Sequence, residues 1–138
     1  MSTHKVQLMD LPAPDPEIDE QIGTLERDAP GNASDVVRVG VIGYGYWGPN
    51  VVRNLDGVEN CQVAAVCDKN PKALRRAHRL YPRVPLTSDF SEILNSPRID
   101  AVAIVTPVWT HFELAKAALE NGKHVFVEKP FTSTSRQA

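Results

Sequence analysis

The chain has 138 residues, of which 42% are hydrophobic and 23% charged, as in one soluble globular domain. No run reaches the roughly 18 apolar residues of a membrane span, and no signal peptide is evident, which argues against a membrane partner. The net charge of −2 divides unevenly, because residues 1–35 carry eight acidic side chains against Lys5 and Arg27, leaving +4 elsewhere. A mildly basic domain suits a small anionic ligand better than a nucleic acid.

Cysteine and histidine usage argues against a metal site. Cys61 and Cys67 bracket one predicted strand without forming a C-x-x-C pair, and the four histidines are scattered. Free thiols in a reducing compartment are therefore expected, which indicates a cytoplasmic protein.

The first 34 residues predict a disordered acidic extension. They contain Pro12, Pro14, Pro16 and Pro30 but no aromatic residue, so they cannot bury much surface. The folded domain is expected over residues 35–138.

Strands and helices alternate along this domain. Strands are expected over residues 36–42, 62–67, 84–87, 101–105 and 124–127, with helices over residues 48–56, 71–81, 89–94 and about 111–120. The apolar run at 101–105 is typical of a strand buried on both faces of a parallel sheet. Right-handed βαβ units then give a doubly wound α/β fold of the Rossmann type, with strand order 3-2-1-4-5. Its ligand is expected at the carboxyl ends of strands one and four.

Apolar spacing predicts which face each long helix buries. The expected buried residues are Trp47, Val51 and Leu55 in the first helix, Ala73, Leu74, Ala77, Leu80 and Tyr81 in the second, and Phe112, Ala115 and Leu119 in the last. The second helix also carries a basic stripe of Lys72, Arg75, Arg76 and Arg79, which is interpreted as a solvated face rather than a nucleic-acid site.

The first strand runs directly into three glycines spaced G-x-G-x-x-G. Gly43 allows a tight turn, Gly45 lets a pyrophosphate approach the backbone, and Gly48 lets the following helix pack closely. The phosphates would lie on free N–H groups at the helix N-terminus, where the dipole favours negative charge. The loop residues expected to bind the cofactor with the glycines are Tyr44, Tyr46 and Trp47. A glycine-rich turn without a ligand is the alternative.

An acidic residue, Asp68, follows Gly48 by 20 positions at the end of the second strand. A carboxylate there accepts hydrogen bonds from the adenosine ribose hydroxyls and repels a 2′-phosphate, which favours NAD over NADP. The adjacent Lys69, also expected beside the cofactor, weakens that preference. The alternative is that Asp68 caps a turn with Asn70 and Pro71.

Two further loops are expected at the same edge. After the fourth strand, Thr106 offers a hydroxyl, Pro107 fixes a bend, and Thr110 is a candidate helix cap. The fifth strand ends in Glu128-Lys129-Pro130, where an ammonium would lie beside the nicotinamide. Burial and a positive ring both lower the pKa of a lysine, which suits acid–base catalysis. A surface lysine is the alternative.

These motifs together resemble the glucose–fructose oxidoreductase, inositol dehydrogenase and MocA family over residues 36–138. The resemblance rests on the run Val39–Gly45, the pattern Thr106-Pro107-x-x-Thr110-His111 and the run Gly122–Pro130. Residues 46–50 and the loop with Trp109 are most similar to members that act on nucleotide sugars, such as UDP-N-acetylglucosamine or UDP-N-acetylglucosaminuronate 3-dehydrogenases.

The resemblance implies an NAD(P)-dependent dehydrogenase acting on CH–OH groups of a sugar or nucleotide sugar. Its second α/β domain would supply most substrate contacts and the interface of a homo-oligomer. Carried over by position, Lys129 would contact the reacting hydroxyl or carbonyl and assist proton transfer, and Pro130 would shape the turn beside the nicotinamide. Thr106, Pro107 and His111 would line the cofactor site, beside Glu128.

The chain's last residues also bear on its organisation. Thr134-Ser135-Arg136-Gln137 fits a capping box that opens a helix, one residue before the end. The chain is therefore expected to be the front of a longer protein, truncated before the second domain, and turnover by these residues alone is not expected. The alternatives are a stand-alone NAD-binding regulatory module and an inactive fragment whose uncovered apolar surface causes poor stability or self-association.

Overall fold

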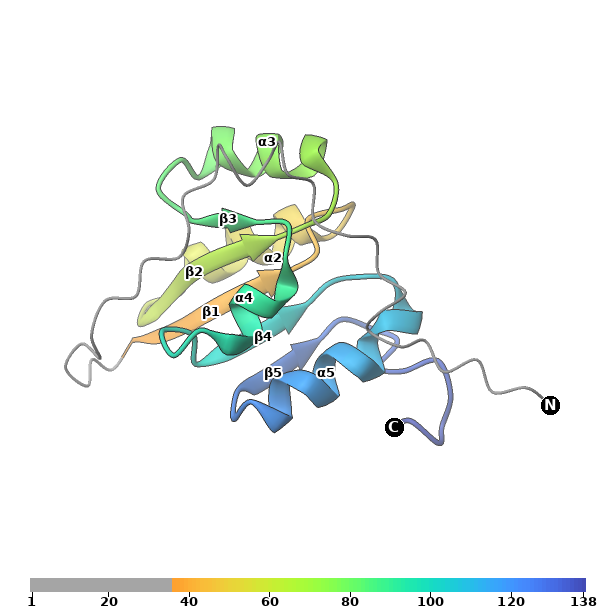
Figure 1. Cartoon of the computed structure of the whole chain (residues 1–138). Coiled ribbons are helices and arrows are strands. Elements are labelled where there is room, and N and C mark those ends of the chain that lie inside the picture. Colours follow the sequence, from red (N-terminus) through yellow and green to blue (C-terminus); the bar gives the residue numbers. More distant parts are fainter. Residues whose placement is uncertain (1–35) are drawn as a thin grey trace.

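The computed structural model describes residues 36–138, which build one parallel sheet with helices on both faces (Figure 1). The strands are β1 (Val37–Ile42), β2 (Cys61–Cys67), β3 (Leu86–Thr87), β4 (Ala101–Ile104) and β5 (His124–Val127). The helices are α2 (Gly48–Asp56), α3 (Pro71–Leu80), α4 (Phe90–Asn95) and α5 (His111–Glu120), and a 3-10 turn, η2 (Val108–Thr110), precedes α5. The extension expected over residues 1–34 lies outside the described residues.

The sheet has the predicted order, β3-β2-β1-β4-β5, and every pair of strands is parallel. Ile42 at the end of β1 pairs with Cys67 of β2 on one side and with Ile104 of β4 on the other. The carboxyl ends of these three strands are therefore level, and the loops that leave them begin side by side. This is the switch point at which open α/β sheets bind ligands.

Each face of the sheet has its own apolar core. Helices α2 and α3 cover one face, where Val52 and Leu74 pack against Val41 and Val66 of the strands. On the other face, α4 and α5 lie in front of the sheet in Figure 1 and contribute the second set of buried side chains. The central strands β1, β2 and β4 are consequently buried over most of their length, whereas the edge strand β5 stays partly exposed. The sequence of β4 is an unbroken apolar run, as expected of a strand covered on both faces.

Short polar contacts set where two of the helices begin. The Asn70 side chain accepts the N–H of Lys72 at 3.0 Å at the start of α3. Asp89 accepts the N–H of Ser91 at 2.8 Å at the start of α4. The N–H of Asp89 itself donates to the Thr87 hydroxyl at 3.0 Å, the bond that a capping box would assign to the side chain of Glu92.

The predicted helix faces need correction. Helix α5 buries His111, Leu114 and Ala118 rather than Phe112, Ala115 and Leu119, so its buried stripe starts one residue earlier. The shift arises because the stripe begins with a buried histidine, which a search for apolar periodicity passes over. Other residues expected in the buried faces but found exposed are Trp47, Leu80 and Leu119. Residues 134–137 form a turn, with the N–H of Gln137 on the carbonyl of Thr134, rather than a helix.

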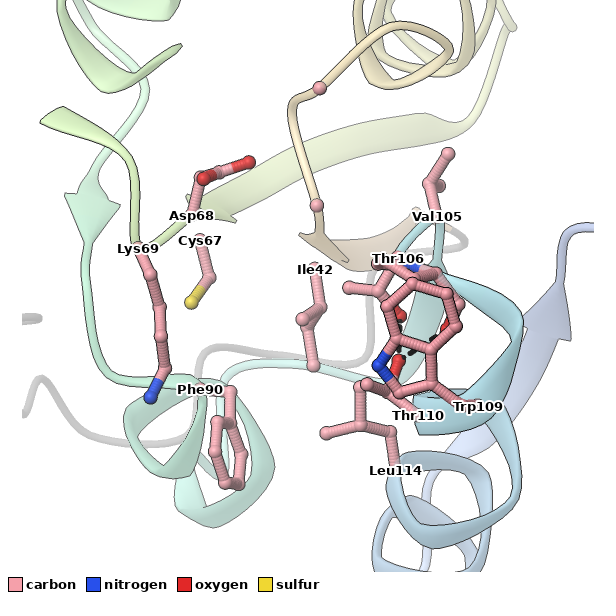
Figure 2. A pocket seen from close by; sticks show the side chains of 13 residues that line it. Ile42, Cys67, Asp68, Lys69, Phe90, Val105, Thr106, Trp109, Thr110 and Leu114 are labelled. Carbon is pink, nitrogen blue, oxygen red and sulfur yellow. Dashed lines mark hydrogen bonds between the residues drawn. The ribbon is translucent and has the colours of Figure 1, made fainter. Parts of the chain in front are cut away.

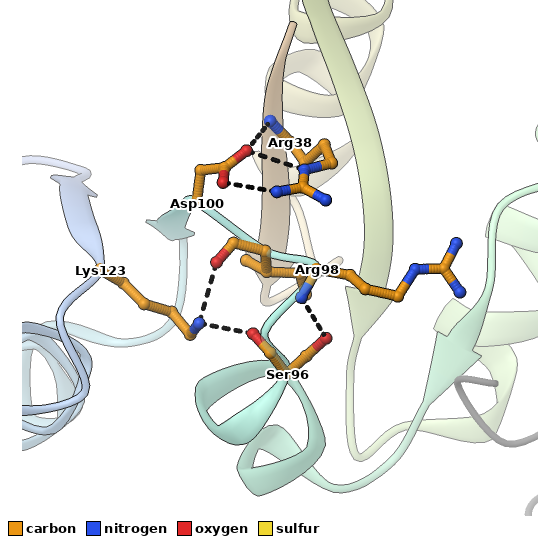
Figure 3. A network of polar contacts seen from close by, with 6 residues as sticks. Arg38, Ser96, Arg98, Asp100 and Lys123 are labelled. Carbon is orange, nitrogen blue, oxygen red and sulfur yellow. Dashed lines mark hydrogen bonds and ion pairs between the residues drawn. The ribbon is translucent and has the colours of Figure 1, made fainter. Parts of the chain in front are cut away.

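A polar network joins the amino ends of β1, β4 and β5 (Figure 3). The Arg38 guanidinium makes two bonds to the Asp100 carboxylate, at 2.9 and 3.0 Å, and lowers the pKa of that carboxyl. The buried Lys123 ammonium donates to the carbonyls of Ser96 at 2.7 Å and Ile99 at 2.9 Å. Burial lowers the pKa of Lys123. These contacts fix the three strands at the edge opposite the expected ligand.

Candidate cofactor-binding site

A cavity of about 300 Å³ opens at the carboxyl edge of the sheet (Figure 2). Its walls come from the ends of β1, β2 and β4, the loops that follow them, and the first turns of α4 and α5. The lining residues are Ile42, Gly43, Gly45, Cys67, Asp68, Lys69, Phe90, Val105, Thr106, Pro107, Trp109, Thr110 and Leu114. Seven of the expected site residues are among them: Gly43, Gly45, Asp68, Lys69, Thr106, Pro107 and Thr110.

The first glycine of the motif is required by both backbone angle and space. Gly43 has φ +103°, a conformation that side chains rarely adopt, and a Cβ there would lie 2.5 Å from the carbonyl oxygen of Val105. Its N–H donates to the carbonyl of Cys67 at 2.8 Å. Gly43 therefore turns the chain out of β1 while touching both neighbouring strands.

The other two glycines of the motif have different surroundings. A Cβ on Gly48 would lie 2.4 Å from the carbonyl oxygen of Gly43, so α2 can start this close to β1 with glycine alone. A Cβ on Gly45 would meet nothing within 4 Å. The protein thus leaves open the space above Gly45, where a dinucleotide's pyrophosphate would approach the backbone.

The Asp68 carboxylate points at the glycine loop. Its Oδ2 accepts the N–H of Tyr44 at 2.6 Å, and its Oδ1 accepts the N–H of Asn70 at 2.7 Å. The two interpretations of Asp68, a group beside the cofactor loop and a turn cap, therefore coexist. Each carboxylate oxygen can accept a second hydrogen bond, so capacity for ribose hydroxyls remains.

The aromatic residues of the loop lie in contrasting environments. The Tyr44 side chain is completely buried, burial raises its pKa, and its hydroxyl has no partner among the described residues. Tyr46 is 93% exposed and stacks on Trp47 with ring centroids 6.1 Å apart. The buried Tyr44 side chain therefore does not reach a ligand, whereas Tyr46 lies on the surface.

Helix α3 also reaches the loop, through Arg76. The Arg76 Nη2 donates to the carbonyls of Tyr44 and Gly45, each at 2.8 Å. Its guanidinium also lies over the Tyr44 ring, 5.3 Å from the centroid. Arg76 is exposed, as the interpretation of the basic stripe as a solvated face predicts, but it also bonds to the glycine loop, which that interpretation did not include.

Two threonines close the loop between β4 and α5. The Thr110 hydroxyl donates to the carbonyl of Pro107 at 2.7 Å, and it lies 2.6 Å from the Thr106 hydroxyl. Because one hydroxyl has a single proton, Thr106 must be the donor to Thr110. Thr110 stands at the N-cap of α5 but makes no capping bond, contrary to expectation.

His111 is buried behind this loop and does not line the cavity. Its Nε2 lies 2.7 Å from the carbonyl oxygen of Thr106, and its Nδ1 lies 2.9 Å from that of Pro130. The imidazole thus joins the loop after β4 to the segment after β5. A neutral ring has one N–H and can donate to one of these carbonyls at a time.

The segment after β5 lies outside the cavity lining as well. The N–H of Lys129 bonds to the Glu128 carboxylate at 2.9 Å, and the peptide bond between Lys129 and Pro130 is cis. Lys129 and Pro130 are exposed in the described residues, as the alternative of a surface lysine predicts.

Sequence reasoning missed the apolar walls of the cavity. They are formed by Ile42, Cys67, Phe90, Val105, Trp109 and Leu114. Figure 2 shows Phe90 and Trp109 on opposite sides, with Ile42 between them and Cys67 on the side of Phe90. Burial raises the pKa of the Cys67 thiol. Lys69, whose pKa burial lowers, runs along the same side as Phe90. A flat, mostly apolar group would fit between these walls.

The described residues contain neither a metal-binding cluster nor a membrane-spanning helix. Within residues 36–138, no group of three or more His, Cys, Asp or Glu side chains could hold a metal ion. None of the helices described is long and apolar enough to cross a membrane.

Comparison with known proteins agrees with this geometry. Residues 37–138 match the Gfo/Idh/MocA family, described as an oxidoreductase family with an NAD-binding Rossmann fold. The chain is 45% identical over 105 residues to the uncharacterized oxidoreductase YdgJ of Escherichia coli, covering 76% of this chain and 30% of that protein. It is 31% identical over 105 residues to scyllo-inositol 2-dehydrogenase (NADP(+)) IolW of Bacillus subtilis, covering 75% and 28%.

A solved structure shows the same relationship in three dimensions. Scyllo-inositol dehydrogenase from Lactobacillus casei, with bound NAD(H) and scyllo-inositol, superimposes with a TM-score of 0.68 at 28% identity, covering 74% of this chain and 30% of that one. The chain belongs to the Gfo/Idh/MocA family of oxidoreductases and corresponds to the Rossmann domain of that family. It spans about 30% of the length of the relatives it matches.

Proposed function

We propose that this chain is the cofactor-binding domain of an oxidoreductase that moves a hydride between NAD and a carbon of a sugar or nucleotide sugar. One observation carries the proposal. The space above Gly45 is open, and the Asp68 carboxylate is bonded to the same loop, at 2.6 Å from the N–H of Tyr44. Diphosphate and ribose sites are thus adjacent at the switch point of the sheet.

Different residues at the site would bind different parts of the cofactor. The N–H groups of the glycine loop would hold the diphosphate, because they stand at the N-terminus of α2. Asp68 would accept the ribose hydroxyls. Phe90 and Trp109 would flank the adenine, since they form opposing apolar walls of the cavity.

We propose NAD rather than NADP as the preferred cofactor. The negative charge of Asp68 would repel a 2′-phosphate, and the neighbouring Lys69 would offset part of that repulsion. Relatives of both kinds exist, because the Bacillus subtilis enzyme is named for NADP and the Lactobacillus casei enzyme binds NAD(H). The choice therefore has to be measured on this chain.

The chemistry would take place beside Lys129. A bound nicotinamide supplies the hydride acceptor or donor. Lys129 would hold the proton of the substrate hydroxyl, and His111 would keep Pro130 beside the loop of Thr106. The inositol named for two relatives supports a polyol or sugar substrate. The glycine-loop aromatics, Tyr46 and Trp47, are the basis for proposing a nucleotide sugar within that class.

Titration calorimetry with NADH and NADPH tests the binding part of this proposal. We expect the 138-residue chain to bind NADH more tightly than NADPH. Absence of binding to both would sink the proposal. The catalytic part needs a protein in which a second domain follows residue 138, and there Lys129→Ala should lower turnover.

A second candidate function is a stand-alone NAD-binding module without turnover. It is favoured by the observation that the described residues form the cavity by themselves, while Lys129 remains exposed. This second candidate would be supported if the natural full-length product binds NADH but shows no reductase activity. The first proposal also includes assembly into a homo-oligomer through a second domain. It further includes a cytoplasmic location, which the two free cysteines suggest.

A further inference from the structure

We propose that Arg76 is a positioning residue that turns the N–H groups of Gly45 and Tyr46 toward the cofactor's diphosphate. The inference rests on the proposed function, because it assigns a role at the same site. It concerns a residue that is absent from the cavity lining, because Arg76 lies on α3 and bonds to two carbonyls of the glycine loop.

The geometry begins with two carbonyl groups that share one donor. Arg76 Nη2 lies 2.8 Å from the carbonyl oxygen of Tyr44 and 2.8 Å from that of Gly45. Two carbonyl dipoles that converge on one point repel each other unless a cation stands between them. The guanidinium supplies that cation, so it stabilises a loop conformation that is otherwise unfavourable.

The direction of these carbonyls fixes the direction of two N–H groups. A trans peptide unit is planar, and its C=O and N–H point in opposite directions. The Tyr44 carbonyl belongs to the same unit as the Gly45 N–H, and the Gly45 carbonyl to the same unit as the Tyr46 N–H. With both carbonyls on Arg76, both N–H groups face away from α3.

These two N–H groups are free to bind a ligand. In the described part of the chain, neither the Gly45 N–H nor the Tyr46 N–H donates to a protein acceptor. Gly45 lines the cavity, and a Cβ on it would meet nothing within 4 Å, so there is room beside it for a ligand. The next N–H group back along the loop, that of Tyr44, is already held by Asp68. The loop is therefore set before an anion arrives, which lowers the entropic cost of binding.

Further contacts keep Arg76 itself in place. Its guanidinium lies over the buried Tyr44 ring, and α3 starts from a defined cap at Asn70. The chain also provides a matched control, because Arg79 is exposed on the same helix, whereas the two bonds to the loop carbonyls come from Arg76.

The experiment compares Arg76→Met with Arg79→Met in the 138-residue chain, since both remove one charge from α3. ADP and adenosine serve as probes, followed by NMR titration and calorimetry. We expect Arg76→Met to weaken the binding of ADP by about tenfold and the binding of adenosine by less than about twofold. Arg79→Met should change neither affinity by more than about twofold. Arg76→Lys, which keeps a cation, should recover part of the loss and serves if Arg76→Met fails to fold.

Several outcomes would overturn the inference. An equal loss of ADP affinity in the two methionine variants would show that helix charge alone matters, and unchanged ADP affinity in Arg76→Met would show no role at all. If the wild-type chain binds no ADP, the proposed function fails, but the ligand-free chain still tests Arg76. The Gly45 and Tyr46 amide resonances should then shift or broaden in Arg76→Met and not in Arg79→Met, and their constancy would refute the positioning role.

Discussion

The Asp68 carboxylate accepts the N–H of Tyr44 at 2.6 Å, which ties the end of β2 to the glycine loop that follows β1. Asp68→Asn removes the charge and leaves one oxygen for two N–H donors, because the Asn70 N–H uses the other carboxylate oxygen. We expect NADH affinity to fall by about tenfold and the preference over NADPH to narrow, since the repulsion of a 2′-phosphate is gone. Calorimetry with both cofactors measures this, with Asp56→Asn as the surface control. An unchanged ratio of the two affinities would contradict the assigned role.

The three glycines of the loop should respond differently to alanine. Gly45→Ala places its Cβ in open space, so the midpoint of thermal unfolding should stay near that of the wild type while NADH binding falls by about tenfold or more. Gly43→Ala meets the Val105 carbonyl at 2.5 Å with an unfavourable φ, so it should lose stability as well as binding. Thermal melts and calorimetry on both variants separate the two effects. Equal loss of stability in both would contradict the open space above Gly45.

The ion pair between Arg38 and Asp100 should make stability depend on pH. The guanidinium lowers the pKa of Asp100, so the folded chain holds that proton less tightly than the unfolded chain. The stabilisation is therefore present above the ordinary carboxyl pKa and is lost as the pH falls through the lowered value. Asp100→Asn should lower the melting temperature at pH 7, and the difference from wild type should shrink below about pH 4.

The control for this pH profile is Glu120→Gln, which breaks an exposed ion pair with Lys116 at 3.8 Å. That pair should contribute little at any pH, because solvent screens it. A difference between Asp100→Asn and wild type that stays constant from pH 7 to pH 3 would argue against the assigned ion pair.

The buried Lys123 should matter for stability and not for ligand binding. Lys123→Met leaves the carbonyls of Ser96 and Ile99 without their donor, which should cost about 1–3 kcal/mol of unfolding free energy. Urea titration measures this, with Lys116→Met as the exposed control. NADH affinity should be unchanged because the network lies at the opposite edge of the sheet. A cofactor defect in folded Lys123→Met would show that the two edges are coupled.

The β5 edge should drive self-association. Among the described strands β5 pairs with β4 alone, and Phe126 on it is 57% exposed. Sedimentation velocity should show association that rises with concentration and is reduced in Phe126→Ser. A monomer at all concentrations would refute this expectation.

Sequence patterns predicted the parts of the fold that depend on local backbone chemistry. The strand order, the helix start at Pro71 and the turn at Gly43 all follow from spacing and from residues with restricted or permissive backbones. The carboxylate of Asp68 was placed correctly beside the loop, because its distance from the glycines reflects the length of one βαβ unit.

Contacts between distant elements were beyond such patterns. Arg76 looks the same in sequence as Arg79, and only the packing of α3 against the glycine loop separates them. The buried face of α5 was misassigned because His111 is held by two carbonyls, a role with no apolar signature. Phe90 reaches the cavity because α4 begins just after the carboxyl end of β3, at the cavity edge of the sheet, and local apolar spacing does not reveal that contact.

The network of Arg38, Asp100 and Lys123 has a consequence for engineering. It anchors the strands at one rim, whereas every segment that shapes the cavity leaves from the other rim. Substituting exposed side chains on the cavity rim, to retune which nucleotide is accepted, should therefore cost the scaffold little thermal robustness, provided that Gly43 and Gly48 are kept.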